Sequence, residues 1–236
     1  MREALRAHQR RIAQVWLLAG SPRLSGLQRL AERHGVPVAL VDRAQLNQLA
    51  GDANHQGAAC DGPALELHSA ERALEAHQQL VLALDGIQDP QNFGAIVRSA
   101  VGLGGAWVLW GEHGAAPLTT ATFRASAGAI EHAQLCRVPS LAQWLMDAQA
   151  RGFQVLGLDA EGKASLREWD LMGPTVLVLG GEGRGLSRGV RRHCTHLVRL
   201  VPPGKIDSLN ASVAAALALY EAQCQRASLP NPPPIH

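Results

Sequence analysis

The pattern of apolar and polar residues changes near residue 80 and divides the chain into two regions. Beyond that point, short continuous apolar runs alternate with segments of helical periodicity. A continuous apolar run is typical of a strand buried on both faces of a parallel sheet. The predicted strands are 80–84, 106–110, 135–138, 153–158, 175–180 and 196–201. The predicted helices are 92–103, 118–130, 141–150, 186–194 and 208–220. This alternation predicts the α/β class, with a parallel sheet covered by helices on both faces.

The first sixty residues follow a shorter pattern, and their length is that of a minimal domain. Helices are expected at 3–12, 27–34 and 43–50, and strands at 15–20, 36–41 and 57–60. We therefore predict a small α/β domain at 1–62, a linker at 63–78, a larger α/β domain at 79–228 and a proline-rich tail at 229–236.

Composition narrows the class of protein. The chain has 236 residues, of which 47% are hydrophobic and 18% charged, and it has no long uncharged apolar run. We therefore expect a soluble globular protein with no membrane partner, located in the cytoplasm because its first residues do not resemble a signal peptide. The four cysteines are scattered, which favours isolated reduced thiols and predicts no metal site.

The charge distribution suggests a nucleic-acid partner. The net charge is only +2, but residues 1–45 contain eight arginines, and residues 184–199 contain five with no acidic residue. Guanidinium groups match the geometry of phosphate oxygens, so two arginine-rich surfaces favour RNA or DNA. Ordinary solvated helix faces would give the same composition, and charge alone does not decide between these interpretations.

Three segments contain candidate functional residues. In the first, 85–100, the loop follows a buried strand, and such loops lie at the sheet edge where open α/β folds bind ligands. Asn92 in this segment is either a functional residue or a helix N-cap. We expect Arg98, on an otherwise apolar helix, to bind a phosphate rather than to form a structural ion pair.

The second segment, 177–187, has four glycines between a strand and a helix, which permit close approach of backbone to a ligand or form a tight turn. It lacks the spacing of a dinucleotide-binding turn, and Glu182 would repel a pyrophosphate. The third segment, 202–212, begins a helix. Ser208 there is either an N-cap or a functional residue, and Asn210 is less easily explained as a cap.

Together these segments resemble the three signature motifs of the SpoU (TrmH-type) RNA ribose 2′-O-methyltransferases of the SPOUT superfamily. The first motif is 89–98 (DPQNFGAIVR) and the second is 179–186 (LGGEGRGL). The third is 200–204 (LVPPG) followed by 208–214 (SLNASVA). The front of the chain resembles the RNA-binding domain of the RlmB-like branch, which methylates a guanosine in large-subunit rRNA. By comparison with that branch, we expect either that this domain lacks the first strand or that the start of the sequence is misassigned.

The resemblance implies a trefoil knot, a homodimer, an rRNA substrate and S-adenosyl-L-methionine as the cofactor. The residues that match the cofactor-binding positions are Leu179, Gly180, Gly181, Gly183, Leu200, Val201, Pro203 and Leu209. The residues that match the polar catalytic set are Asn92, Arg98, Glu182, Ser208 and Asn210. The alternatives are a tRNA methyltransferase of the same family and a non-catalytic RNA-binding protein on the same scaffold.

The resemblance also assigns Arg98 as the base that takes the ribose hydroxyl proton. A guanidinium remains protonated in proteins and is a poor base. We therefore expect Arg98 to bind the target phosphate, and that phosphate or a polar neighbour to take the proton.

Overall fold

The computed structural model of the chain describes residues 1–51, 55–75, 80–114, 118–201 and 208–227. It divides into two compact units, Met1–Glu66 and Leu67–His236, which we call unit 1 and unit 2. Each unit has its own sheet. Pro203, one of the residues matched to a cofactor-binding position, lies outside the described residues.

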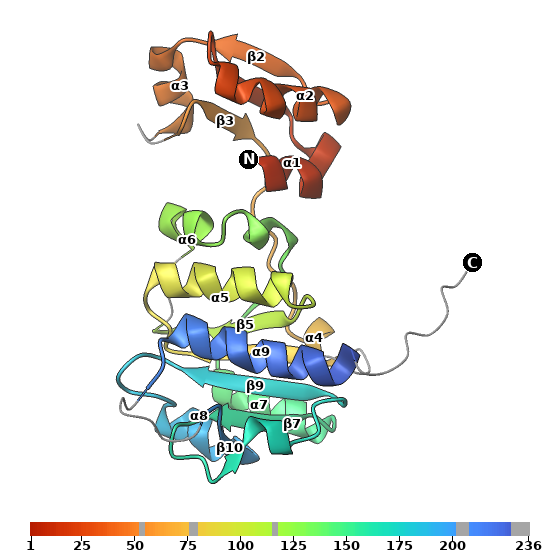
Figure 1. Ribbon diagram of the computed structural model, residues 1–236, viewed down its shortest axis with the longest axis vertical. Coiled ribbons are helices and arrows are strands. Elements are labelled where there is room, and N and C mark those ends of the chain that lie inside the picture. The colour runs from red at the N-terminus through yellow and green to blue at the C-terminus, as the bar shows by residue number, and fades with distance from the viewer. Residues whose placement is uncertain (52–54, 76–79, 115–117, 202–207, 228–236) are drawn as a thin grey trace, which may run out of the picture. The chain divides into compact units, whose positions relative to one another are not determined.

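Unit 1 is a small α/β layer structure, coloured red to orange in Figure 1. Its elements are α1 (Arg2–His8), η1 (Gln9–Arg11), β1 (Gln14–Leu18), η2 (Pro22–Leu24), α2 (Ser25–Arg33), β2 (Val38–Val41), α3 (Arg43–Ala50) and β3 (Ala58–Asp61). In the described residues its strands have the order β2-β1-β3, with β2 parallel and β3 antiparallel to β1. Leu5, Val15 and Leu17 are fully buried in its core, which also contains Leu27 and Leu30.

Local signals in the sequence explain the helix limits in unit 1. Helix α3 begins with a capping box, in which Asp42 accepts a hydrogen bond from the Gln45 backbone and Gln45 accepts one from the Asp42 backbone. It ends at Gly51, which adopts the left-handed conformation usual for a glycine C-cap. The helix predicted at 43–50 is therefore confirmed.

Unit 2 alternates strands and helices. Its elements are α4 (Arg72–Glu75), β4 (Leu80–Asp85), α5 (Pro90–Gly102), β5 (Trp107–Gly111), α6 (Thr120–Ala125), η3 (Ala129–His132), β6 (Leu135–Val138), α7 (Leu141–Ala150), β7 (Gln154–Leu158), β8 (Ala164–Ser165), η4 (Leu166–Glu168), β9 (Thr175–Gly180), α8 (Arg188–Arg192), β10 (His196–Arg199) and α9 (Ala211–Ala227). The six predicted strands are all present, and β8 and the division of the predicted helix 118–130 into α6 and η3 were not predicted.

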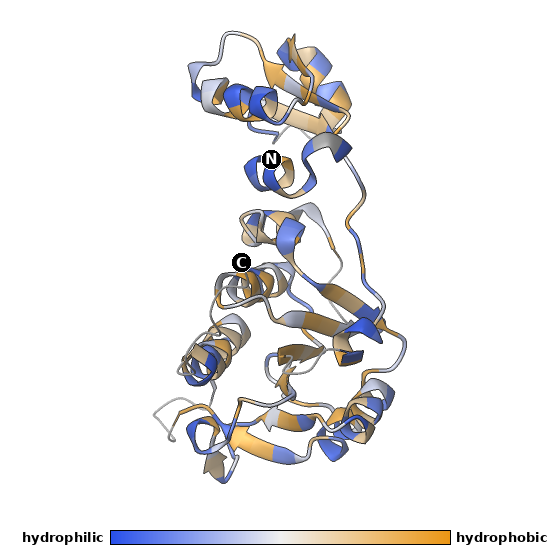
Figure 2. Ribbon diagram, turned by 90° about the vertical axis from the view of Figure 1, so that its right-hand side faces the viewer, coloured by the Kyte–Doolittle hydropathy of each residue, from blue (hydrophilic) through white to orange (hydrophobic). Residues whose placement is uncertain are grey.

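Within the described residues, the strands of unit 2 form one seven-stranded parallel sheet in the order β6-β5-β4-β9-β7-β10-β8. Helices cover both faces of this sheet (Figure 2). Helix α9 packs on α5 and β9, while α7 packs on β7 and α8. The predicted parallel sheet with helices on both faces is confirmed. None of the described helices is long and apolar enough to cross a membrane.

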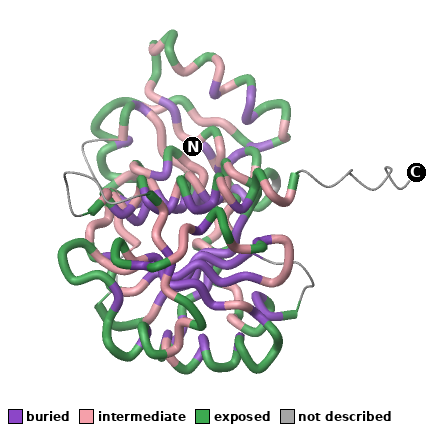
Figure 3. The backbone as a smooth tube through the Cα atoms, turned by 60° about the horizontal axis from the view of Figure 1, so that its bottom comes forward, coloured by how far each residue is buried: buried purple, intermediate pink, exposed green. Residues whose placement is uncertain are grey.

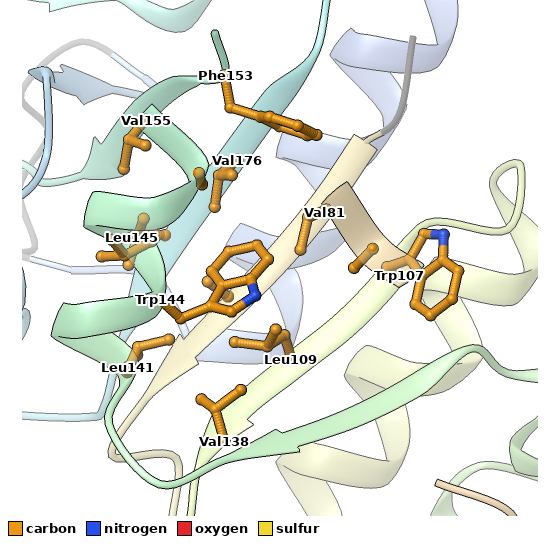
Figure 4. Packing of buried hydrophobic residues seen from close by; sticks show 14 of the residues in the cluster. Val81, Trp107, Leu109, Val138, Leu141, Trp144, Leu145, Phe153, Val155 and Val176 are labelled. Carbon is orange, nitrogen blue, oxygen red and sulfur yellow. The ribbon is translucent and has the colours of Figure 1, made fainter. Parts of the chain in front are cut away.

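The central strands β4, β5, β7 and β9 are buried on both faces, and much of the chain around them is exposed (Figure 3). Beneath α7, the side chains of Trp144 and Leu145 pack against Val81, Leu109 and neighbouring strand residues (Figure 4). The Trp144 indole N–H donates to a backbone carbonyl, that of Ala70, at 3.2 Å. Its one polar atom is thereby satisfied, so this large side chain is buried without an unpaired donor.

A glycine determines how closely α5 packs on α6. A Cβ atom at Gly94 would lie 2.5 Å from the carbonyl oxygen of Thr122 and 2.6 Å from the Cβ of Ala125. The neighbouring residue Phe93 is fully buried and makes an edge-to-face contact with Trp110, with ring centroids 5.1 Å apart. Phe93 and Gly94 therefore position helix α5, and Asn92, the residue before them, lies on this helix.

Candidate functional site

The three candidate segments meet at the carboxyl edge of the parallel sheet in unit 2. Asp85, at the end of β4, pairs with Gly180, at the end of β9. Leu179 lies between Leu84 of β4 and Leu158 of β7 in the sheet register. The loops that follow these strands therefore leave the sheet side by side, as predicted for the loop after β4.

The glycine-rich loop after β9 is fastened to the loop after β4. The Gly181 N–H donates to the carbonyl oxygen of Asp85 at 2.8 Å, and the Ser187 N–H donates to the Asp85 carboxylate at 2.6 Å. A side chain at Gly181 would collide with the carbonyl oxygen of Gly86, so glycine is required for this contact. The tight-turn interpretation of the glycines is therefore correct at this position.

Asp85 is a site residue that we did not single out from the sequence. Its backbone and carboxylate together hold both ends of the glycine-rich loop. A signal was available, because an acidic residue directly after a buried strand lies at the functional edge of a parallel sheet. Asp85 acts by positioning the loop that carries Glu182.

Helix α5 begins two residues earlier than predicted, and its N-cap is Asp89 rather than Asn92. The Asp89 carboxylate accepts a hydrogen bond from the Gln91 N–H at 2.9 Å, and Pro90 occupies the first helical position. The Asn92 side chain therefore does not cap the helix. Asn92 instead donates from Nδ2 to Oε1 of Glu182, 90 positions further along the chain.

The start of α9 also differs from the prediction. Ser208 was a candidate N-cap, but α9 begins at Ala211 and the cap is Asn210. Oδ1 of Asn210 accepts hydrogen bonds from the Ser212 N–H at 2.9 Å and the Val213 N–H at 3.4 Å. Its Nδ2 donates to Oδ1 of Asn92 at 3.1 Å.

Glu182, Asn92 and Asn210 therefore form one directed network, which we call the amide relay. The helix N–H groups require Oδ1 of Asn210 as acceptor, so its Nδ2 must be the donor to Asn92. Asn92 then has its oxygen occupied and offers Nδ2 to the Glu182 carboxylate. The amide relay joins all three candidate segments and orients an acceptor-only group at its end.

Arg98 and Ser208 are not part of the amide relay. Both side chains are exposed, and Arg98 forms no ion pair with a carboxylate among the described residues. Arg98 lies on the solvent side of α5, and its contact with a phosphate stays a prediction. The guanidinium is accordingly available to a phosphate, and no internal acceptor competes for it.

The residues matched to cofactor positions lie at the same edge of the sheet. Leu179 is buried, and Gly180, Gly181, Leu200 and Leu209 are half-buried. Gly183 is at the exposed tip of the glycine-rich loop with a φ of +76°, and Val201 is exposed. Apolar side chains and backbone groups at the ends of parallel strands suit an adenosine, whose base needs an apolar slot and a few backbone partners.

The fold and the site define a SpoU-type methyltransferase domain. The family model described as "SpoU rRNA Methylase family" matches residues 79–220, and the model "RNA 2'-O ribose methyltransferase substrate binding" matches residues 1–68. The chain belongs to the SpoU rRNA Methylase family.

Relatives of known name cover nearly the whole chain. It is 41% identical over 222 residues to "23S rRNA (guanosine-2'-O-)-methyltransferase RlmB" of Xanthomonas campestris, covering 91% of this chain and 89% of that protein. It is 38% identical over 232 residues to the protein of the same name in Pseudomonas aeruginosa, covering 95% and 93%. The crystal structure of the SpoU methyltransferase AviRb from Streptomyces viridochromogenes with AdoMet is 26% identical, with a TM-score of 0.73 and coverage of 92% and 84%.

Proposed function

We propose that this protein transfers a methyl group from S-adenosyl-L-methionine to the ribose 2′-hydroxyl of a guanosine in 23S-type rRNA. The observation that carries this proposal is the amide relay, which brings Asn92, Glu182 and Asn210 together from three motifs. The names of the relatives in Xanthomonas and Pseudomonas support guanosine and 23S rRNA. The match of residues 1–68 to a substrate-binding domain supports RNA recognition by unit 1.

S-adenosyl-L-methionine fits the residues at the sheet edge. Leu179, Leu200 and Leu209 supply apolar side chains, and Gly180 and Gly181 supply backbone groups at the carboxyl end of β9. The glycine-rich segment 177–187 also lacks the features of a phosphate-binding loop. This suits S-adenosyl-L-methionine, which has no phosphate. When bound, the cofactor supplies a methyl group on a sulfonium centre.

The side chains then have two tasks, which are to position the ribose and to remove one proton. We assign the proton to the Glu182 carboxylate, the one titratable group of the amide relay. Its Oε1 is held by Asn92, and its Oε2 has no hydrogen-bond partner among the described residues. We assign Arg98 to the phosphate next to the target ribose, and Ser208, an exposed residue two positions before Asn210, to a further polar contact with the RNA.

A methyl-transfer assay tests the proposal. The protein is incubated with methyl-labelled S-adenosyl-L-methionine and unmodified 23S rRNA or tRNA, and the labelled nucleotide is mapped. We expect label on one guanosine ribose of 23S rRNA. Label only in tRNA would support a tRNA enzyme of the same family. Absence of label with either RNA would support a non-catalytic RNA-binding protein. Either result would overturn the proposal.

The substitution Glu182→Gln tests the assignment of the proton. It keeps the hydrogen-bond acceptor for Asn92 and removes the base. We expect kcat to fall about 10²- to 10⁴-fold, the usual contribution of general base catalysis. An unchanged kcat would assign the proton to the RNA phosphate instead.

We also propose a homodimer that forms through α9. Val213, Leu217 and Tyr220 are exposed by 46%, 41% and 58%, and their spacing of four and three places them on one helix face. A stripe of large apolar side chains on a helix is unusual for a surface in contact with water. The stripe begins three residues after Asn210, in the first turn of α9, so a partner on it would lie near the site.

The trefoil knot is proposed on the family resemblance and on the position of β9. This strand lies between β4 and β7, and the chain passes to β10 before it returns as α9 to pack on β9 and α5. We place the protein in the cytoplasm, where ribosomal RNA of this type would be its substrate.

A further inference from the structure

A basic groove lies on unit 2 between α8 and the start of β10. It has a volume of about 370 Å³ and is lined by Arg188, Arg191, Arg192, Cys194, Thr195, His196 and Leu197. We call it the arginine groove. It opens at the amino end of β10, whereas the amide relay lies beyond the carboxyl ends of β4 and β9. No residue of the amide relay lines the groove, and α8 and β10 lie at one end of unit 2 in Figure 1.

The positive charge of the arginine groove is only partly neutralised. Arg191 forms an ion pair with Asp159, which is mostly buried. Arg188 and Arg192 are exposed, and neither has an ion-pair partner among the described residues. Two guanidinium groups one helical turn apart therefore face solvent with no internal acceptor, and such groups match phosphate oxygens in geometry and charge.

An aromatic pair borders the same groove. His196 is exposed and lines the groove, and its ring packs on Trp169 with centroids 4.2 Å apart and an angle of 37° between the planes. Trp169 is half-buried and provides a rigid support for the imidazole. A supported ring beside free arginines is the combination by which proteins bind single-stranded nucleic acid, with bases on the ring and phosphates on the cations.

We propose that the arginine groove binds a single-stranded RNA segment that flanks the methylated nucleotide. Arg188 and Arg192 contact two phosphates, and His196 stacks on one base. The identity of the RNA rests on the proposed function, but the chemistry of the groove does not. Unpaired RNA is favoured over a duplex because a base must be free of its partner in order to stack on a side chain.

The salt dependence of RNA binding tests the phosphate contacts. For the wild type and the double variant R188A/R192A, the affinity for a fluorescent single-stranded RNA is measured over a range of salt concentrations. Each phosphate contact on single-stranded RNA contributes about 0.7 to the slope of log K against log salt, so the slope should fall by about 1.4. An unchanged slope would overturn the proposal.

A matched control separates the groove from net charge. The double variant R137A/R167A also removes two positive charges. Both arginines are exposed, and Arg137 lies 3.9 Å from Glu112 and Arg167 lies 3.8 Å from Glu221. We expect its slope to equal that of the wild type. A fall equal to that of the groove variant would show that only total charge matters and would overturn the proposal. Near-ultraviolet circular dichroism verifies that both variants are folded.

Two substitutions at His196 test stacking. His196→Ala should weaken binding about fivefold to a hundredfold with little change in salt slope, since one stacked base is lost. His196→Phe keeps a ring on Trp169 and should retain affinity. The single-strand proposal would be overturned if His196→Ala and His196→Phe weakened RNA binding equally. It would also be overturned if the wild type bound duplex and single-stranded RNA with equal affinity.

The two proposals fail separately. If no RNA is methylated, the proposed function is wrong, and the binding measurements still decide on the groove. If rRNA is methylated, R188A/R192A should raise KM for RNA and leave kcat at saturating RNA unchanged. A methylating enzyme whose salt slope and KM are unaffected by this variant would overturn the groove alone.

Discussion

At the scale of single residues, Asn210 has a structural role and a positioning role, and one substitution can separate them. Its oxygen caps α9 and its nitrogen donates to Asn92. Aspartate is an equally good cap but has no donor. Asn210→Asp should therefore keep the free energy of unfolding within about 0.5 kcal/mol, and should lower kcat roughly 10²-fold through misplacement of Asn92 and Glu182. Urea unfolding and methyl-transfer kinetics measure the two effects. A variant with full activity would show that the amide relay does not orient Glu182.

Arg98 provides a second test at this scale. Lysine retains the positive charge but cannot form two parallel hydrogen bonds to a phosphate. Arg98→Lys should therefore raise KM for RNA or lower kcat, with a combined loss in kcat/KM of about tenfold. Steady-state kinetics with varied RNA concentration measure the change. Near-full activity would argue against a forked phosphate contact.

Two cysteines should be unreactive in the folded protein. Burial raises the pKa of the Cys136 thiol to about 12 and that of the Cys194 thiol to about 11, with a smaller contribution from Asp85 at Cys194. Both folded-state values lie above the ordinary value, so this contribution to stability is complete below about pH 9 and is lost as the pH rises through 11 and 12. At pH 8, iodoacetamide should label both thiols only after unfolding, as read by mass spectrometry. Rapid labelling of the native protein would contradict this.

Residue types predicted the site better than they predicted its local roles. Asn92 and Asn210 were candidate site residues because of their motifs. Asn92 and Ser208 were also possible caps, but Asp89 and Asn210 cap the two helices. Aspartate, serine and asparagine all cap helices, so a sequence with several of them near a helix start does not identify the cap. The contact of Asn92 with Glu182 spans 90 positions, and periodicity carries no information on such a contact.

At the scale of elements, Gly94 determines the packing of α5 on α6. Alanine there would place a methyl group 2.5 Å from a backbone oxygen, which cannot move without moving α6. Gly94→Ala should lower the free energy of unfolding by about 1–3 kcal/mol, the usual cost of overpacking. Thermal and urea denaturation measure it. Gly102→Ala is the control, because a Cβ at Gly102 meets no atom within 4 Å. Equal effects of the two substitutions would contradict the packing argument.

The central strands β4, β5 and β9 were predictable because each is a mostly continuous apolar run, and a strand that is buried on both faces has this pattern. Strand β8 was missed because it has only two residues, too few for periodicity. The order of the strands was not predictable. Strand β9 pairs with β4 and β7, and this position depends on how distant segments fit together.

At the scale of the whole molecule, the apolar stripe on α9 should determine the oligomeric state. Leu217→Lys places a charge in the proposed interface and should convert a dimer into a monomer, as measured by sedimentation equilibrium. Met146→Lys is the matched control, because Met146 is an equally exposed apolar residue on α7, at 44%. A wild type that is monomeric at all concentrations, or a dimer that tolerates Leu217→Lys, would contradict the proposed homodimer.

The amide relay has a consequence for the time at which the protein becomes active. Its members come from three parts of the chain, and the last of them, Asn210, is oriented by N–H groups as late as Val213. A ribosome must therefore have synthesised about nine-tenths of the protein before the relay can close. Chains that are released early through a damaged message would carry the RNA-binding unit but no complete active centre.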